Sequence, residues 1–222
     1  MLKAILIIAC LILAAVFIWV EKKEHYILAV VLKGLASLCF VLLGFQTGDG
    51  SHLARMIVAG LIVGAIADVL LNLRYVFREK GQLAFLVGIL VFMTGHILYI
   101  SALWPLTRGK LVAVLAALLC TGGLMAFILP RITAKPAFKI FGIFYIGAIV
   151  LMNCVAASNV ILHPTLFTGV FMTGAVLFLI SDIVLILNTF GPKQRFPLRI
   201  TNLMLYYIGQ IFIAMSLMCI QF

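Results

Sequence analysis

Long apolar stretches constrain this chain more than any other feature of its sequence. Hydrophobic residues make up 66% of its 222 residues and charged residues 10%, whereas a soluble domain has ~45–50% apolar and ~25% charged residues. A transmembrane helix needs about 20 predominantly apolar residues. The sequence contains eight such segments, separated by short runs with charges, glycine or proline. We therefore expect an all-α membrane protein, a single polytopic domain over residues 1–222. The predicted helices cover about 2–20, 26–45, 54–73, 83–103, 111–129, 138–158, 165–189 and 199–220.

The net charge is +10, but the basic residues lie between the apolar segments and do not form one basic stripe. They therefore indicate membrane topology and not a nucleic-acid partner. Eleven of them fall on one face of the predicted bundle and four on the other. The positive-inside rule assigns the first face to the cytoplasm and both termini to the opposite side. Short loops indicate a bacterial plasma membrane, or the endoplasmic reticulum for a eukaryotic relative. The five cysteines have neither CxxC nor metal-ligand spacing, so no disulfide framework is expected.

A repeat emerges when the chain is shifted by 114 residues. The aligned pairs include Gly60 with Gly174, Asp68 with Asp182, and Gly95 with Gly209. The matched acidic residues favour an internal duplication over coincidence, with units 1–110 and 111–222 of four helices each. An axis along the membrane normal would relate such units. It would set the two aspartates on opposite walls of one polar cavity.

Three ionisable residues stand out because they lie deep inside the predicted helices: Lys33, Asp68 and Asp182. Each costs several kcal/mol in a membrane unless it is paired or hydrated. A structural ion pair explains one aspartate and leaves the other without a partner. Two carboxylates and one ammonium in a low-dielectric layer favour one retained proton. The three residues therefore predict an acid and base pair, with Lys33 keeping one carboxylate ionised.

His96 is a fourth candidate catalytic residue, although Tyr99 or a backbone carbonyl could equally satisfy its ring. The other three histidines fall in loops or at helix ends, so no metal site and no cofactor are expected. The candidate substrate-binding residues are polar side chains in the membrane. They are Asn72, Tyr99, Tyr145, Ser181, Tyr206, Tyr207 and Gln210.

Four short stretches, with Lys33 in the second helix, resemble the YhhN-like lysoplasmalogenase family. They are Ala67-Asp68-Val69-Leu70-Leu71, Gly95-His96-Ile97-Leu98-Tyr99, Phe178-Leu179-Ile180-Ser181-Asp182 and Tyr206-Tyr207-Ile208-Gly209-Gln210. The likeness covers nearly the whole chain, and Gly34 departs from it where the family commonly has proline. The resemblance implies a lysophospholipid substrate in the membrane. It also implies cleavage of the vinyl ether bond of lysoplasmalogens to a fatty aldehyde and glycerophosphoethanolamine or glycerophosphocholine.

The paired carboxylates suit that chemistry. Protonation of the outer alkene carbon gives an oxocarbenium ion that water captures, which resembles the division of labour in glycosidases. One aspartate would donate the proton and the other would stabilise the cation, and the sequence leaves open which does which. Basic residues at the rim could bind the phosphate, although topology alone explains their charge. They are Arg74, Arg78, Arg195 and Arg199.

A second hypothesis from another class is a proton-coupled transporter of small molecules or lipids, since duplicated helices and membrane carboxylates suit alternating access. Two features count against it. The carboxylates lie toward one face and not at the midplane, and no glycine or proline breaks flank them. A purely structural scaffold would leave three ionisable groups in one layer unexplained.

Overall fold

The computed structural model describes residues 1–77 and 79–220, and within them the chain forms eight long α-helices and no strand. All eight are long and apolar enough to cross a membrane. The predicted fold class is therefore confirmed, and the chain is an integral multi-pass membrane protein. The helices are α1 Leu2–Lys22, α2 Tyr26–Thr47, α3 His52–Leu73, α4 Gly81–Leu103, α5 Lys110–Ile128, α6 Pro136–Leu162, α7 Leu166–Phe190 and α8 Phe196–Ser216.

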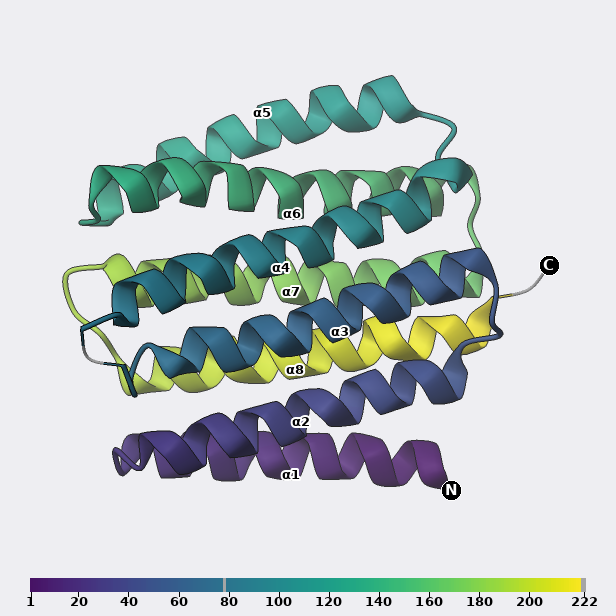
Figure 1. The fold of residues 1–222 in the computed structure, drawn as a ribbon. Coiled ribbons are helices and arrows are strands. Elements are labelled where there is room, and N and C mark those ends of the chain that lie inside the picture. Colours follow the sequence, from purple (N-terminus) through teal and green to yellow (C-terminus); the bar gives the residue numbers. More distant parts are fainter. Residues whose placement is uncertain (78, 221–222) are drawn as a thin grey trace.

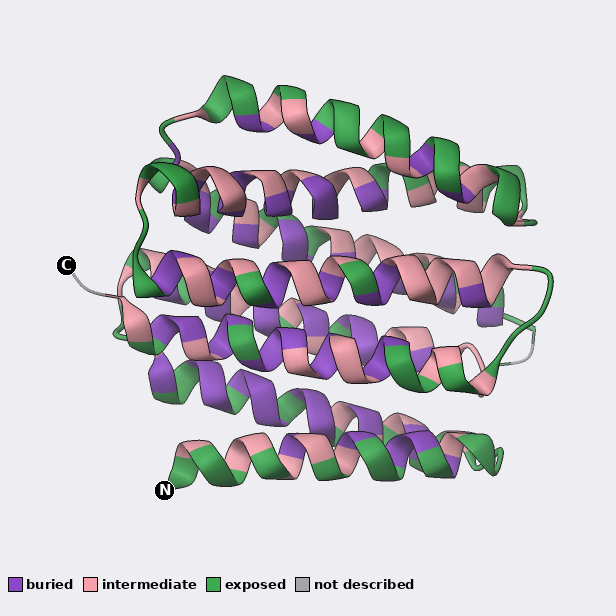
Figure 2. Ribbon diagram, turned by 180° about the vertical axis from the view of Figure 1, so that it is seen from behind, coloured by how far each residue is buried: buried purple, intermediate pink, exposed green. Residues whose placement is uncertain are grey.

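The helices run antiparallel along the sequence, and Figure 1 shows how they are layered. The pair α5 and α6 lies at one edge, the pair α1 and α2 at the opposite edge, and α3, α4, α7 and α8 between them. Figure 2 shows the exposed positions concentrated on the outermost helices and the buried ones on the central helices. The core lies around the middle four helices and extends onto α2 and α6, which carry the buried polar residues Lys33 and Tyr145.

One end of the bundle carries most of the loop charges, and we call it the basic end. There α1, α3, α5 and α7 finish and their successors begin, in connections that include Lys23, Arg74, Lys80, Lys135 and Lys193. An even number of crossings places the start of α1 and the finish of α8 together at the opposite end. The assignment of the basic end to the cytoplasm stays a prediction, as does the particular membrane.

Most helix boundaries lie within two residues of the expected ranges, and the larger differences are in α6 and α8, which ends at Ser216 and not at residue 220. Helix α8 begins at Phe196, three residues before the predicted start, because Pro197 in its first turn needs no hydrogen-bond acceptor for a backbone N–H. Helix α6 continues to Leu162 and not only to residue 158. Helix α7 starts with a reciprocal capping box between Thr165 and Thr168, which satisfies backbone groups at the membrane boundary.

Close glycine contacts bind the central helices in two matching pairs. A Cβ atom added to Gly95 of α4 would lie 3.3 Å from the carbonyl oxygen of Gly60 in α3. A Cβ atom added to Gly174 of α7 would lie 2.7 Å from the carbonyl oxygen of Gly209 in α8. Small residues allow membrane helices to approach this closely. The 114-residue shift matches Gly60 with Gly174 and Gly95 with Gly209, so the two contacts are equivalent under that shift. The internal repeat itself stays a prediction.

The α7–α8 contact leads to a test of packing. Gly174→Ala puts a methyl group against backbone atoms that cannot move aside, so we expect the free energy of unfolding to fall by about 1–3 kcal/mol. The measurement is thermal melting of the purified protein in detergent. Gly169→Ala in the same helix is the matched control, because a Cβ atom there meets nothing within 4 Å. Equal melting temperatures for the two variants would contradict a tight crossing.

Candidate active site

A polar cavity lies toward the basic end, where six helices converge. Lys33 of α2, Asp68 of α3, Tyr145 of α6, Asp182 of α7 and Tyr206 of α8 all line it. Phe85 and Phe92 supply the wall from α4. The three ionisable residues singled out in the sequence therefore meet in one cavity, although they come from three helices far apart in the chain.

Asp68 is the most heavily bonded group in the cavity. Its Oδ1 lies 3.1 Å from the Lys33 ammonium. Its Oδ2 accepts hydrogen bonds from the Ser37 hydroxyl and the Tyr206 phenol, both at 2.6 Å. A buried ion pair is tolerated when further hydrogen bonds satisfy its remaining lone pairs. These contacts tie α2, α3 and α8 together.

Asp182 stands in a different environment, although it is equally buried. The Tyr145 phenol donates a hydrogen bond to its Oδ2. Among the described residues no cationic side chain pairs with Asp182. An isolated carboxylate is costly in an apolar interior, and a protonated carboxyl group is far less so. The two aspartates thus have unequal surroundings, with a cation at one and only a phenol at the other.

A chain of hydrogen bonds extends from Asp68 deeper into the bundle. Gln210 donates to the Tyr206 oxygen at 3.3 Å, and the Tyr99 phenol donates to the Gln210 amide oxygen at 3.2 Å. Neither Gln210 nor Tyr99 is among the residues that line the cavity. These two predicted substrate-binding residues instead fix the orientation of Tyr206, which does line it.

His96 does not line the cavity either. Its ring is 1% exposed and neither ring nitrogen has a hydrogen-bond partner within the described residues. It packs edge-on against Phe178, with ring centroids 4.8 Å apart, and lies 5.7 Å from the Tyr145 ring. The histidine is therefore a neighbour of Tyr145 behind the cavity wall, and its predicted catalytic role stays a prediction.

Two other predicted substrate-binding residues serve helix packing. Ser181 donates to the backbone oxygen of Asn202 at 3.0 Å, and the Asn202 amide donates back to the Ser181 hydroxyl at 2.8 Å. The Tyr207 phenol donates to the Lys33 carbonyl oxygen at 3.5 Å. Asn72, by contrast, lines the cavity and donates to Glu21 at 3.1 Å. Asn72, Tyr145 and Tyr206 are thus the predicted binding residues that face the cavity.

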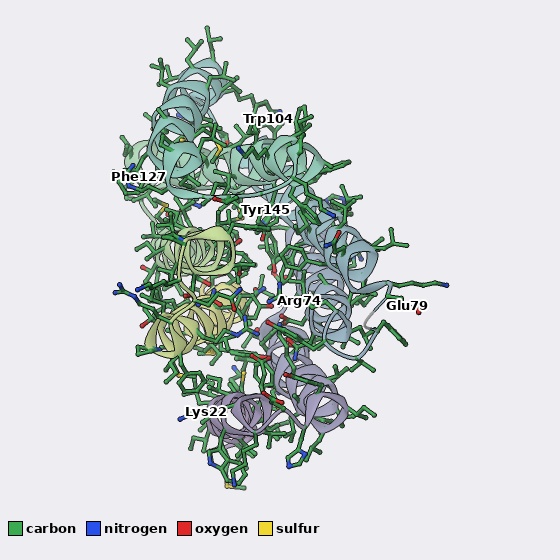
Figure 3. All side chains as sticks on the ribbon, turned by 90° about the vertical axis from the view of Figure 1, so that its left-hand side faces the viewer. Lys22, Arg74, Glu79, Trp104, Phe127 and Tyr145 are labelled. Carbon is green, nitrogen blue, oxygen red and sulfur yellow. The ribbon has the colours of Figure 1, made fainter. Side chains whose placement is uncertain are left out.

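The basic end carries a second, outer cavity that shares Arg74 and Arg199 with the polar one. Arg199 makes a two-pronged ion pair with Glu21, at 2.9 and 3.0 Å. Arg74 bonds to the Tyr75 phenol and lies over the Phe85 ring, but in the described part of the chain no carboxylate pairs with it. Burial lowers the pKa of the Arg74 guanidinium, and the Arg199 charge acts in the same direction. Figure 3 looks onto this end.

Of the four rim arginines named in the sequence, Arg195 lines only the outer cavity and Arg78 lies outside the described residues. Across residues 1–77 and 79–220, no three His, Cys, Asp or Glu side chains cluster as a metal site would need.

Comparison with known proteins agrees with the resemblance found in the sequence. The YhhN family model matches residues 28–217, which contain every residue of the polar cavity. The chain belongs to the YhhN family. Lysoplasmalogenase TMEM86A of Bos taurus is 28% identical over 209 residues, covering 90% of this chain and 82% of the relative. A lysoplasmalogenase of Mycobacterium tuberculosis is 32% identical over 134 residues, covering 58% of this chain and 47% of the relative. No solved structure matches.

Two polar contacts of this YhhN site were missed in the sequence. Ser37 lies four residues after Lys33, so helical spacing puts both on one face, and that spacing could have found it. Glu21 looked like a loop charge at the end of the first helix, yet it binds Arg199 and Asn72. No local pattern marks it, because its partners come from other helices.

The Lys33–Asp68 pair of this YhhN protein leads to a stability test. Lys33→Met leaves a buried carboxylate without its cation, so we expect the free energy of unfolding to fall by about 3–5 kcal/mol. Adding Asp68→Asn removes the orphaned charge and should restore much of the loss. Thermal melting in detergent measures both, with Lys193→Met in an exposed loop as the control. A double variant less stable than Lys33→Met would contradict the ion pair.

Proposed function

We propose that this protein hydrolyses the vinyl ether bond of lysoplasmalogens in the membrane by acid and base catalysis with Asp68 and Asp182. The observation that carries the proposal is one cavity with two carboxyl groups in unequal surroundings. Pairs of carboxyl groups whose environments differ are the usual source of separate acid and base roles. The relatives named lysoplasmalogenase support the same reaction class, and they give the transporter hypothesis no support.

The unequal surroundings favour one assignment of roles. Asp182 accepts from a phenol and has no paired cation within residues 1–77 and 79–220, so it is the better candidate for the protonated acid. Asp68 pairs with the Lys33 ammonium and accepts hydrogen bonds from Ser37 and Tyr206, so it is the better candidate to stabilise positive charge. A fixed carboxylate in a site that excludes bulk water stabilises a developing cation strongly.

The reaction then needs one water molecule and no net proton. Asp182 gives its proton to the outer alkene carbon, and the ether oxygen shares the resulting positive charge at the adjacent carbon. Water oriented by Asp68 attacks that carbon, and its released proton returns to Asp182. The hemiacetal moves a proton from its hydroxyl to the ether oxygen and breaks that carbon–oxygen bond. The products are a fatty aldehyde and the glycerophospho head group.

Arg74 is the best candidate to bind the substrate phosphate. A guanidinium group binds phosphate through paired hydrogen bonds. Two N–H donors of Arg199 already form such a pair with the Glu21 carboxylate. Arg74 follows Asp68 by six residues, which is about 9 Å along a helix. The phosphate and the vinyl ether of a lysophospholipid are separated by the three glycerol carbons, so one molecule can reach both groups.

The carboxylate roles are tested by aldehyde release from an alkenyl lysophospholipid. We expect Asp182→Asn to lower the rate by at least about 100-fold, because general acid catalysis contributes ~10²–10⁴-fold. Asp68→Asn should also lose most activity, and wild-type release should persist with a chelator present. Asp49→Asn, in an exposed loop at the opposite end, is the matched control. The carboxylate pair is excluded as the catalytic centre if both cavity variants fold and keep most of the wild-type rate.

The phosphate assignment is tested by Arg74→Gln. This variant should raise KM roughly tenfold or more, as expected for the loss of a charge-assisted hydrogen bond worth ~1.5–3 kcal/mol. The comparison substrate is the alkenyl glycerol that lacks the phosphate, for which wild type and variant should differ little. Arg108→Gln, exposed at the other end, serves as the control. An equal loss with both substrates would show that Arg74 does not recognise phosphate.

A further inference from the structure

An apolar cavity lies beside the polar one, toward the edge of the bundle formed by α5 and α6. Among the described residues that line it, only Lys139 and Tyr145 have polar side chains. The two cavities share five wall residues: Leu71, Phe85, Phe92, Tyr145 and Leu185. The proposed chemistry of the polar cavity makes no use of this second space.

We propose that the apolar cavity binds the hydrocarbon chain of the lysophospholipid and selects its length. The inference rests on the proposed function, and it adds the part of the site that recognises the chain. A chain bound there would lie beside the carboxylates, with its far end toward α5.

Tyr145 is the first support, because it stands at the boundary. It lines both cavities and donates a hydrogen bond to Asp182. The alkene carbon that takes up the proton belongs to the hydrocarbon chain, so the acid must stand where the chain leaves the polar cavity. Asp182 and Tyr145 meet that requirement.

Phe85 is the second support, because it separates head group from chain. Its ring lies 4.5 Å below the Arg74 guanidinium and also lines the apolar cavity. Phe138 and Phe190 pack around it, with ring centroids 6.0 Å from that of Phe85 in each case. A phosphate on Arg74 and a chain in the apolar cavity would thus lie on opposite sides of this aromatic cluster.

The far wall is formed where α5 and α6 face the interior. Met125 and Ile128 are two of the four buried residues of α5, and both line the cavity. Gly142 of α6 lines it as well, and a Cβ atom added there would meet nothing within 4 Å. The wall therefore has room for a larger side chain at Gly142, which would shorten the space left for a ligand.

The cavity should act on selectivity more than on affinity. Lipid tails are as apolar as leucine side chains, so a chain that moves from the bilayer into the cavity gains little from the hydrophobic effect. A chain longer than the available space must bend or displace the vinyl ether from Asp182. Chain length should therefore change kcat/KM through positioning.

The test compares Gly142→Leu with Gly122→Leu, measuring aldehyde release in nanodiscs from alkenyl lysophospholipids with 16-carbon and 8-carbon chains. Gly122 is the matched control, because it is exposed on α5 and a Cβ atom there also meets nothing within 4 Å. We expect Gly142→Leu to lower kcat/KM for the long chain by roughly tenfold and to leave the short chain within about twofold. Gly122→Leu should change neither. Met125→Ala, which enlarges the far wall, should shift preference toward longer chains.

An equal change for both chain lengths in Gly142→Leu, or no change, would overturn the chain site while leaving the proposed function intact. Absence of aldehyde release by wild type would instead overturn the proposed function. The chain site is then decided by binding alone. Saturated alkyl-ether lysophospholipids should raise the melting temperature of wild type more with 16 carbons than with 8, and Gly142→Leu should abolish that difference. An unchanged difference would overturn the inference.

Discussion

The buried ion pair between Lys33 and Asp68 is the constraint on which the rest of the site depends. Neither charge can remain in an apolar bundle alone, and the pair needs further donors for its free lone pairs. Ser37 and Tyr206 supply them, and Gln210 and Tyr99 then hold Tyr206 in place. The hydrogen bonds that surround the Asp68 carboxyl group thus fix the relative positions of α2, α3, α4 and α8.

The same constraint explains why Asp182 differs from its counterpart. Among the described residues the lysine of the cavity pairs with Asp68, so Asp182 is left with the phenol of Tyr145. In the proposed reaction this inequality separates the acid from the carboxylate that stabilises the cation. The α1–α2 edge of the bundle supplies the charge, while the α5–α6 edge supplies the phenol and the apolar cavity.

The fold was largely predictable because each span must be long and apolar whatever its neighbours are. The meeting of Lys33, Asp68 and Asp182 was also predictable, since charges inside a membrane need one another. The choice of Asp68 as the lysine's partner was not, because it depends on how α2 and α3 are rotated about their axes. Ser181 was placed beside Asp182 by sequence, yet its side chain contacts Asn202 on α8.

The apolar cavity could not be predicted from the sequence, because most of its lining residues belong to helices that are apolar on every side. Whether side chains fill the space between α4, α5, α6 and α7 or leave a cavity there depends on how those side chains pack. His96 shows the same limit. Its neighbours Phe178 and Tyr145 come from other helices, so it could not be foreseen that its ring has no hydrogen-bond partner in the described part of the chain.

The position of the cavities along the bundle makes the site one-sided. Asp182 lies eight residues before the end of α7, about 12 Å from the basic end, in a hydrocarbon layer about 30 Å thick. Farther from the basic end, Tyr99 and Phe171 are fully buried and pack edge to face, with ring centroids 5.9 Å apart. The described residues that line the two cavities lie toward the basic end. A hydrolase of this shape would draw its substrate from a single leaflet, and so its turnover would change the two leaflets unequally.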